Sequence, residues 1–403
     1  MLKLLFSRCK QEVINLDYIS DNTKMISYSK IRVMFNKALE LESPISFTVG
    51  EPDFTASENV VEATVTALRE GKSKYSENAG IMPLRQALSK YLKKELEMDY
   101  DPKTEITVTT GAMSGIFQAL KVILNPGDEV IINEPCWTNY IQQVIMCGGK
   151  PVSVPVDFEN GFALCPDNIK NAITSRTKAI MINSPCNPTG AVVPAEILAE
   201  VAEIAKKHDL LVISDEVYKH ILFDDEKHTS ISTFPGMRER TLIIDSFSKT
   251  FAMTGFRVGY VAGPDEIIAN ITKLQENTTA CVAMPCQYGA LAALQGDKTH
   301  LNGMVCSYKE RRDYLFERIN AMPLVKFKKP KGTFYAFVSI KDTGMTSMDF
   351  AMKLLEEEQV IVVPGDAFGN YGEGYIRLSF ATSMENIKTG MDRMEKFLNR
   401  LTK

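Results

Sequence analysis

Residues 210–218 read LLVISDEVY, an apolar run that ends in two acidic side chains. Leu211, Val212 and Ile213 are typical of a buried strand. Ligands of open α/β sheets bind beyond the carboxyl ends of the strands, so Asp215 is predicted to face a binding site. Taken alone, a carboxylate at such a position is more often a helix cap or a loop residue.

Six further strand-like runs alternate with helical periods from about residue 105 onward. They cover residues 105–110, 129–133, 151–155, 178–183, 241–246 and 257–262, and the first run quoted covers 210–215. The clearest helix is predicted at 194–208, where Ile197, Val201 and Ile204 share one face. This alternation predicts an α/β fold whose large domain contains a mostly parallel, seven-stranded sheet.

After about residue 300 the pattern changes to that of a smaller α+β domain. We expect a charged helix at 308–321, a β-rich stretch at 325–340, a helix at 348–358, strands at 360–363 and 375–380, and a last amphipathic helix. Because 403 residues are too many for one compact core, we expect several parts. These are an N-terminal segment at 1–49 that packs on the small domain, the large domain at 50–295, and the C-terminal part of the small domain at 296–403.

Composition excludes several classes of function. The formal charge is −4, from 46 basic and 50 acidic residues, so no basic excess favours nucleic acid or an anionic membrane as a partner. No apolar run is long enough to span a bilayer. The eight cysteines form no CxxC pair and the four histidines no HExxH or HxH pair, so we expect reduced thiols and no metal site. The apolar patch at residues 4–6 is too short for a signal peptide, which predicts a cytoplasmic protein.

A second motif, SFSK at residues 246–249, also follows an apolar strand. A lone lysine is usually a solvated surface charge. Lys249, however, follows two hydroxyl side chains and stands eight residues before Arg257 in a glycine-rich stretch. A buried or neighbour-perturbed lysine can form a Schiff base with a carbonyl compound, and hydroxyls with a guanidinium suit a phosphate monoester.

Two weaker motifs lie at other predicted strand ends. TTGAMSG at residues 109–115 leads into a helix predicted at 116–124, and free N–H groups at a helix start can bind a phosphate. NSPCNPTG at 183–190 would hold the side chain of Asn187 at a fixed angle. Small residues are common at strand-to-helix turns, and a plain turn would explain the second motif equally well.

In their order along the chain, these motifs resemble those of the class I and II aminotransferases, which are fold-type-I pyridoxal-phosphate enzymes. The resemblance covers nearly the whole chain from about residue 20. It is carried by GEPDF at 50–54, YSENAG at 75–80 with Leu84 and Arg85, NPTG at 187–190, DEVY at 215–218, SFSK at 246–249, Arg257, and YIRLS at 375–379. It implies that the large domain binds pyridoxal 5′-phosphate and that the protein is similar to prokaryotic aspartate and aromatic aminotransferases.

The resemblance implies catalytic roles for three residues. Lys249 would bind the cofactor as a Schiff base and, once displaced, would move the proton between the substrate α-carbon and the cofactor C4′ atom. Asp215 would pair with the pyridine nitrogen and keep it protonated, so that the ring can accept the electrons of the substrate carbanion. Tyr218, together with Asn187, would hydrogen-bond the phenolic oxygen of the ring.

Further residues are implied to bind the cofactor or the substrate. The implied phosphate ligands are the backbone N–H groups of Gly111, Ala112 and Met113 and the side chains of Ser246, Ser248 and Arg257. Trp137, the only tryptophan, would stack on the pyridine ring, although it could also be a core residue. Tyr75 would reach the phosphate in the neighbouring subunit's site, which implies a homodimer with shared active sites. Arg377 would bind the substrate α-carboxylate in bidentate fashion beside Asn187 and the backbone of Gly50.

The implied reaction moves the amino group of an L-amino acid to a 2-oxo acid such as 2-oxoglutarate by a ping-pong mechanism. Aspartate aminotransferases of the most similar prokaryotic branch commonly carry, at the position of Met113, a lysine that pairs with the distal carboxylate. Methionine offers no charge, so a dicarboxylate would be left with an unpaired charge, and we expect a neutral, aromatic or large apolar donor. The alternative is an aspartate aminotransferase in which an unaligned loop or the other subunit supplies the cation.

Two other functions are weaker alternatives. A pyridoxal-phosphate-dependent C–S β-lyase would start from the same carbanion, but that branch usually departs from the contexts of NPTG and Arg257 that this chain keeps. A cofactor-binding regulatory module would need a DNA-binding domain, and the residues before Ser43 are too few and not basic enough for one.

Overall fold

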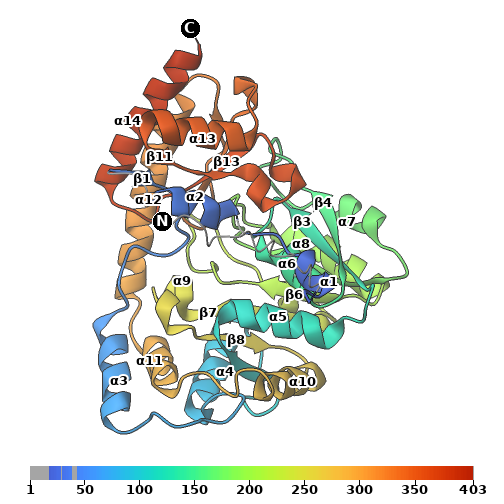
Figure 1. Ribbon diagram of the computed structural model, residues 1–403. Coiled ribbons are helices and arrows are strands. Elements are labelled where there is room, and N and C mark those ends of the chain that lie inside the picture. Colours follow the sequence, from blue (N-terminus) through green and yellow to red (C-terminus); the bar gives the residue numbers. More distant parts are fainter. Residues whose placement is uncertain (1–17, 29, 39–42, 403) are drawn as a thin grey trace, which may run out of the picture.

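A computed structural model describes residues 18–28, 30–38 and 43–402 of the chain (Figure 1). Its largest sheet has seven strands in the order β2-β8-β7-β6-β5-β3-β4. The strands are β2 (Ile106–Thr109), β3 (Glu129–Glu134), β4 (Lys150–Pro155), β5 (Thr177–Asn183), β6 (Leu211–Asp215), β7 (Thr241–Ser246) and β8 (Gly259–Ala262). Each corresponds to one of the seven predicted runs, so the predicted fold class is confirmed.

The sheet is mostly parallel, as predicted. The pairs β3–β4, β3–β5, β5–β6 and β6–β7 are parallel, whereas β8 runs antiparallel to both β7 and β2. Only residues 247–258 connect β7 to β8, and they contain the short helices α9 (Phe247–Thr250) and η3 (Thr254–Phe256). Such a short connection, without a full crossover helix, suits an antiparallel pair.

Helices cover both faces of this sheet because the side chains of each strand alternate between the faces. On one face, α5 (Gly111–Ile123) and α10 (Asp265–Glu276) pack on side chains such as Ile213 and Ile244. On the other face, Val212 belongs to a hydrophobic cluster with side chains of α8 (Ala195–Lys207), and Ile243 belongs to a second cluster with side chains of α4 (Met82–Leu96). The remaining helices around the sheet are α3 (Glu58–Arg69), α6 (Asn139–Met146), α7 (Pro166–Ala172) and α11 (Met284–Gln295).

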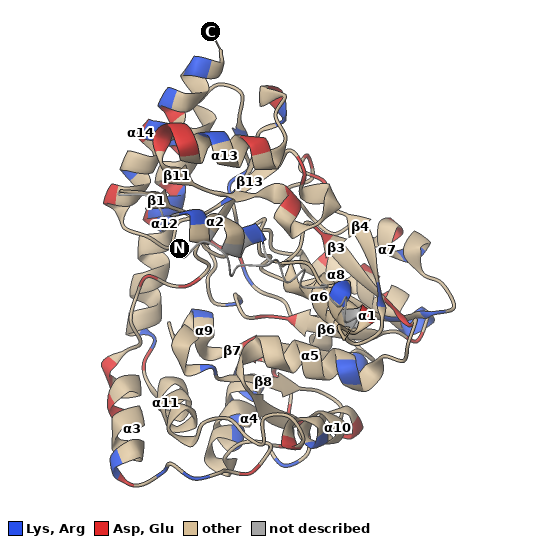
Figure 2. Cartoon of the chain, in the orientation of Figure 1, with Lys and Arg blue, Asp and Glu red and all other residues tan. Residues whose placement is uncertain are grey.

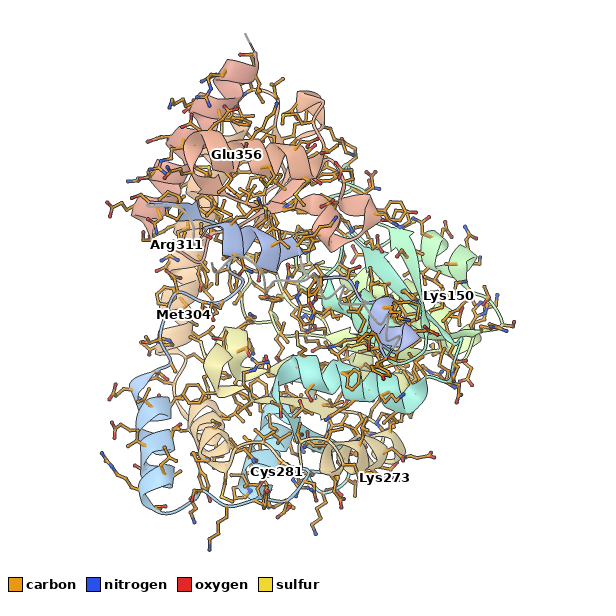
Figure 3. All side chains as sticks on the ribbon, viewed as in Figure 1. Lys150, Lys273, Cys281, Met304, Arg311 and Glu356 are labelled. Carbon is orange, nitrogen blue, oxygen red and sulfur yellow. The ribbon has the colours of Figure 1, made fainter. Side chains whose placement is uncertain are left out.

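A second sheet belongs to the C-terminal part of the chain, drawn in orange and red in Figure 1. Its four antiparallel strands follow the order β12 (Val363–Pro364), β13 (Tyr375–Ser379), β10 (Tyr335–Ser339) and β9 (Lys326–Phe327). The helices α13 (Ser347–Glu358) and α14 (Met384–Leu401) accompany it. The long helix α12 (Thr299–Asn320), on which Met304 and Arg311 are labelled, leads from the seven-stranded half into this part (Figure 3).

The N-terminal segment contacts both halves of the molecule. β1 (Ile45–Ser46) pairs in parallel with β11 (Val360–Ile361), and the Lys30 ammonium lies 2.6 Å from Asp366 Oδ2. In contrast, the Ser27 N–H donates to Gln142 on α6. The helices of this segment are α1 (Asp21–Lys24) and α2 (Lys30–Ala38). Elsewhere in the chain, short 3-10 turns occur at Ile231–Thr233, Arg238–Arg240, Lys341–Thr343, Gly365–Phe368 and Asn370–Gly372. The division of the chain at residues 49/50 and 295/296 stays a prediction, and residues 1–17 lie outside the described part.

Three predicted boundaries differ from the structure. α5 begins at Gly111 rather than at 116, because Gly111, Ser114 and Gly115 lower the helical preference of its first residues. The strand expected at 360–363 is divided between β11 and β12, which belong to different sheets. The helix expected from residue 308 begins at Thr299.

Acidic and basic residues are interspersed along the elements (Figure 2), and their numbers, 50 and 46, are nearly equal. Among the described helices, none combines the length and apolarity that crossing a bilayer requires. The expected cytoplasmic location stays a prediction.

Candidate active site

The carboxyl ends of β2, β3, β5, β6 and β7 lie along one edge of the large sheet, because these strands run in the same direction. The segments that follow these ends line a cavity of about 610 Å³. This is where ligands of open α/β sheets bind. Residues 48–51 and two residues of the C-terminal sheet, Tyr335 and Arg377, complete the lining.

All but two of the predicted site residues, Gly111 and Tyr75, line this cavity. The predicted residues that line it are Gly50, Ala112, Met113, Trp137, Asn187, Asp215, Tyr218, Ser246, Ser248, Lys249, Arg257 and Arg377. Gly111 lies against it, since a Cβ atom there would be only 2.7 Å from Arg257 Nη2. Tyr75 does not reach it and is 86% exposed on this chain.

The Asp215 carboxylate is buried at the end of β6. Its Oδ2 atom accepts a hydrogen bond of 2.5 Å from the Tyr140 hydroxyl, and Oδ1 accepts one of 3.3 Å from the Val217 N–H. Burial raises the pKa of Asp215 to about 7, although both hydrogen bonds favour the charged form and so oppose the shift. The hydrogen-bond partners of the Asp215 carboxylate are therefore neutral donors, and none of the described residues forms an ion pair with it.

The Lys249 ammonium projects into the cavity from α9, directly after β7. Its Nζ donates a 2.6 Å hydrogen bond to the Gly50 carbonyl and lies 5.8 Å from the centre of the Tyr218 ring. Burial lowers the pKa of Lys249 to about 8, and the nearby Arg257 and Arg377 charges add to this effect. An amine with such a lowered pKa is partly neutral near physiological pH, and the neutral form is the nucleophile toward carbonyls.

The guanidinium of Arg377, on β13, is 2% exposed. It donates to the Thr48 carbonyl at 2.7 Å and to Asn187 Oδ1 at 3.1 Å, and it lies 4.4 Å from the centre of the Tyr335 ring. Its Nε has no hydrogen-bond partner, and within the described ranges no carboxylate pairs with it. A buried cation with an unused donor is suited to bind an anion of a ligand.

The end of the cavity near α5 combines donors that suit a phosphate. α5 begins at Gly111, whose φ of +71° and missing Cβ allow the close approach of Arg257. The Ser246 hydroxyl caps α9 by accepting a 3.3 Å hydrogen bond from the Ser248 N–H. The exposed Arg257 donates to the Thr254 carbonyl and, among the described side chains, contacts no carboxylate.

The aromatic side chains of Trp137 and Tyr218 both line the cavity. The Trp137 ring meets Tyr140 edge-on, with 5.3 Å between the ring centres. The Tyr218 hydroxyl is 2.9 Å from that of Tyr335, and a Cβ atom on Gly50 would be 2.7 Å from the Tyr335 hydroxyl.

Sequence reasoning missed Tyr140, Tyr335 and Thr48 as residues of the site. Tyr140 stands three residues after Trp137, at the start of α6, and this nearness in the sequence could have placed it near the same cavity. Tyr335 and the Thr48 carbonyl arrive from distant parts of the chain, and their sequence context gives no such signal. No group of histidine, cysteine and carboxylate side chains suitable for a metal ion occurs in the part of the chain that the structure describes.

A family model described as aminotransferase class I and II matches residues 42–394. The chain belongs to this family. The aminotransferase is 44% identical to an aspartate aminotransferase of Pyrococcus abyssi over 94% of this chain and 98% of that protein. It is 42% identical to an aromatic-amino-acid aminotransferase of Thermococcus litoralis, with the same coverage of both chains. A solved aromatic aminotransferase of Pyrococcus horikoshii is similar with a TM-score of 0.88 and 42% identity, over 92% of this chain and 99% of that one.

Class I and II aminotransferases use pyridoxal 5′-phosphate, and the cavity of this aminotransferase fits that group. The buried Asp215 carboxylate lacks a cationic partner, and a pyridinium nitrogen would supply one. The Gly111 turn leaves space beside Arg257 that a Cβ atom would fill, which suits a phosphate. The substrates of this aminotransferase are an amino acid and a 2-oxo acid.

The unusual pKa of Asp215 makes the stability of the cofactor-free protein depend on pH. The folded carboxyl group keeps its proton up to about pH 7, whereas the unfolded chain releases it near 3.8. The folded state thus binds more protons between these values, and this group lowers the unfolding free energy as pH rises from about 4 through 7. Urea unfolding of wild type and of Asp215→Asn measures this effect. The free energy of unfolding of the wild type, relative to that of the variant, should fall by roughly 2–3 kcal/mol between about pH 5 and 8.

Tyr140→Phe is the matched control for this measurement, because it removes a hydrogen bond that favours the charged carboxylate. In that variant the fall should extend to higher pH. A difference between wild type and Asp215→Asn that stays constant with pH would contradict the assigned pKa.

Proposed function

We propose that this aminotransferase takes the amino group from a neutral donor, an aromatic or large apolar L-amino acid, and gives it to a 2-oxo acid such as 2-oxoglutarate by a ping-pong mechanism. The observation that carries the proposal is the meeting of Lys249, Asp215 and Arg377 in one cavity. When bound, pyridoxal 5′-phosphate supplies an electron-accepting ring that stabilises negative charge at the substrate α-carbon.

Lys249 is proposed to hold the cofactor covalently and to move the proton at the α-carbon of the amino acid. Its pKa of about 8, lowered by burial, supports both tasks because the amine can gain and lose a proton near neutral pH. Asp215 is proposed to hold a proton on the pyridine nitrogen. Tyr140 supports this role by orienting the carboxylate with a short hydrogen bond.

The other residues of the cavity are proposed to bind and orient the cofactor and the substrate. Tyr218 and Asn187 would donate to the phenolic oxygen of the ring, and Trp137 would stack on its face. The proposed phosphate ligands are the N–H groups of Gly111, Ala112 and Met113 with the side chains of Ser246, Ser248 and Arg257. Arg377 would bind the substrate α-carboxylate, with Asn187 and the Gly50 backbone beside it, and its unpartnered Nε supports this role.

The donor preference rests on the charges in the cavity. Among its described lining residues the cations are Lys249, Arg257 and Arg377, and each already has a proposed task. Met113, which is 38% exposed, offers no charge to a second carboxylate. Aspartate remains the second candidate donor, because the Pyrococcus abyssi relative is an aspartate aminotransferase.

The exposed position of Tyr75 supports a homodimer with shared active sites. Its hydroxyl has no role in the cavity of its own chain, and an 86% exposed tyrosine is available to another subunit. We propose that it donates a hydrogen bond to the cofactor phosphate of the partner subunit.

The central test is the variant Lys249→Ala. Turnover should fall about 10³-fold or more, since both the covalent attachment and the proton transfer are lost. Borohydride should fix the cofactor to the wild-type protein at Lys249 but not to the variant, as peptide mass analysis would measure. Lys273→Ala, on α10, is the control and should behave as wild type (Figure 3). Transamination retained in purified Lys249→Ala would overturn the proposal.

Met113→Lys tests the proposed donor preference. The new cation should raise kcat/KM for aspartate about tenfold or more relative to phenylalanine, because it would pair with the distal carboxylate. Met113→Leu keeps an apolar side chain and should leave the ratio close to that of the wild type. A wild-type enzyme that strongly prefers aspartate to phenylalanine and tyrosine would refute the preference.

Tyr75→Phe tests the shared site. Loss of a hydrogen bond to a charged phosphate should weaken cofactor binding about tenfold or more, measured by equilibrium titration. Tyr371→Phe, at another exposed tyrosine, should leave binding unchanged. Full activity in a holoenzyme that sediments as a monomer would speak against the dimer.

A further inference from the structure

A buried ion pair lies behind the wall of the active-site cavity, outside the set of residues that line it. Lys219 follows Tyr218 directly and is 3% exposed. Its Nζ lies 2.9 Å from Oδ2 of Asp245, which is also buried and directly precedes Ser246. The transamination chemistry gives neither charge a task.

Asp245 connects three elements through its carboxylate. Oδ1 accepts a 2.6 Å hydrogen bond from the Ser246 N–H, and Oδ2 accepts one of 3.0 Å from the hydroxyl of Tyr260 besides the Lys219 ion pair. Tyr260 is the residue opposite Asp245 on β8. Because side chains alternate along a strand, Asp245 points away from the cavity that Ser246 faces.

Lys219 is enclosed by groups that keep it charged. Its Nζ lies 3.4 Å from the Tyr260 hydroxyl and 4.9 Å from the centre of the Tyr91 ring. Burial lowers the pKa of Lys219, but the Asp245 carboxylate, together with Tyr260, Tyr91 and Glu216, more than offsets this, so the pKa lies well above its usual value. Burial and the Lys219 charge together lower the pKa of the neighbouring His220 to about 3, so His220 adds no second cation.

The backbone around Asp245 also touches the start of α5. A Cβ atom on Gly259 would lie 2.6 Å from Ala112 N and 2.9 Å from the Asp245 carbonyl oxygen. Gly259 is paired with Ser246 and so lies between the end of β7 and the first turn of α5. A displacement of Asp245 would therefore reach the Ser246 hydroxyl and the helix N–H groups together.

We propose that Lys219 and Asp245 are positioning residues that set the affinity of the site for the phosphate of its cofactor. A buried ion pair is seldom a net source of stability, because desolvating two charges costs about as much as their attraction returns. This pair instead fixes the spacing between the segments of Tyr218 and Ser246 and the orientation of the Ser246 peptide. The inference rests on the proposed role of Ser246 and α5 as the phosphate site.

The test is the double variant Lys219→Met with Asp245→Asn, which removes both charges and keeps side-chain volume. Cofactor-free, full-length protein is titrated with pyridoxal 5′-phosphate and with pyridoxal, which lacks the phosphate. The Kd for pyridoxal 5′-phosphate should rise about tenfold or more, while the Kd for pyridoxal changes less than about twofold. A general loosening of the fold would weaken both ligands alike, and that result, or no change in either, would overturn the proposal.

Two controls separate this inference from the proposed function. Lys396→Met with Glu358→Gln removes another buried carboxylate, which pairs with Lys396 and Arg400 between α13 and α14, and should leave both Kd values unchanged. If the wild-type protein itself binds the two ligands equally well, the proposed phosphate site fails, whatever the ion pair does.

Tyr260→Phe decides the matter where the double variant does not fold. It removes one donor to Asp245 without changing any charge. The Kd for pyridoxal 5′-phosphate should then rise about threefold with that for pyridoxal unchanged. Equal effects on both ligands, or none, would again overturn the proposal.

Discussion

The burial of one carboxylate, Asp215, is the constraint on which the active site depends. A charged group without a cationic partner is costly in a cavity of low polarity, and the raised pKa of Asp215 expresses that cost. The cost of burying Asp215 accompanies its position, since parallel strands bring it to the same sheet edge as Ser246, Lys249 and the α5 turn. A pyridinium ring would relieve the unfavourable charge, so the same desolvation that penalises the empty protein favours the cofactor.

Much of the fold and of the site was predictable because the informative patterns are local. Each strand of the large sheet is a short apolar run, and the motifs that follow at Asp215 and Lys249 lie directly at strand ends. Once a parallel sheet is predicted, side chains at these ends are expected along the same edge of the sheet. This geometry supports a shared site for the motifs at Asp215 and Lys249, whereas the places of Gly50, Trp137 and Arg377 in the site are implied by the resemblance to the class I and II aminotransferases.

The rest depends on tertiary contacts that no local pattern encodes. Tyr335 and the Thr48 carbonyl reach the cavity from the C-terminal sheet and from the N-terminal segment, which pack together only in the folded chain. The first turn of α5 is stabilised by its surroundings rather than by residue preference, so its start was placed too late. Tyr75 lies where a single chain gives it no partner, and the identity of the donor depends on side-chain charges rather than on the fold.

The attachment of the N-terminal segment limits how this protein can be shortened. Phe47 exchanges backbone hydrogen bonds with Ile361 and Ser379, and the adjacent Thr48 carbonyl holds Arg377. A truncation at the expected border near residue 50 would remove both anchors and leave a buried guanidinium with fewer acceptors. Shortened versions intended for crystallisation or immobilisation therefore have to retain the chain from Ile45 onward.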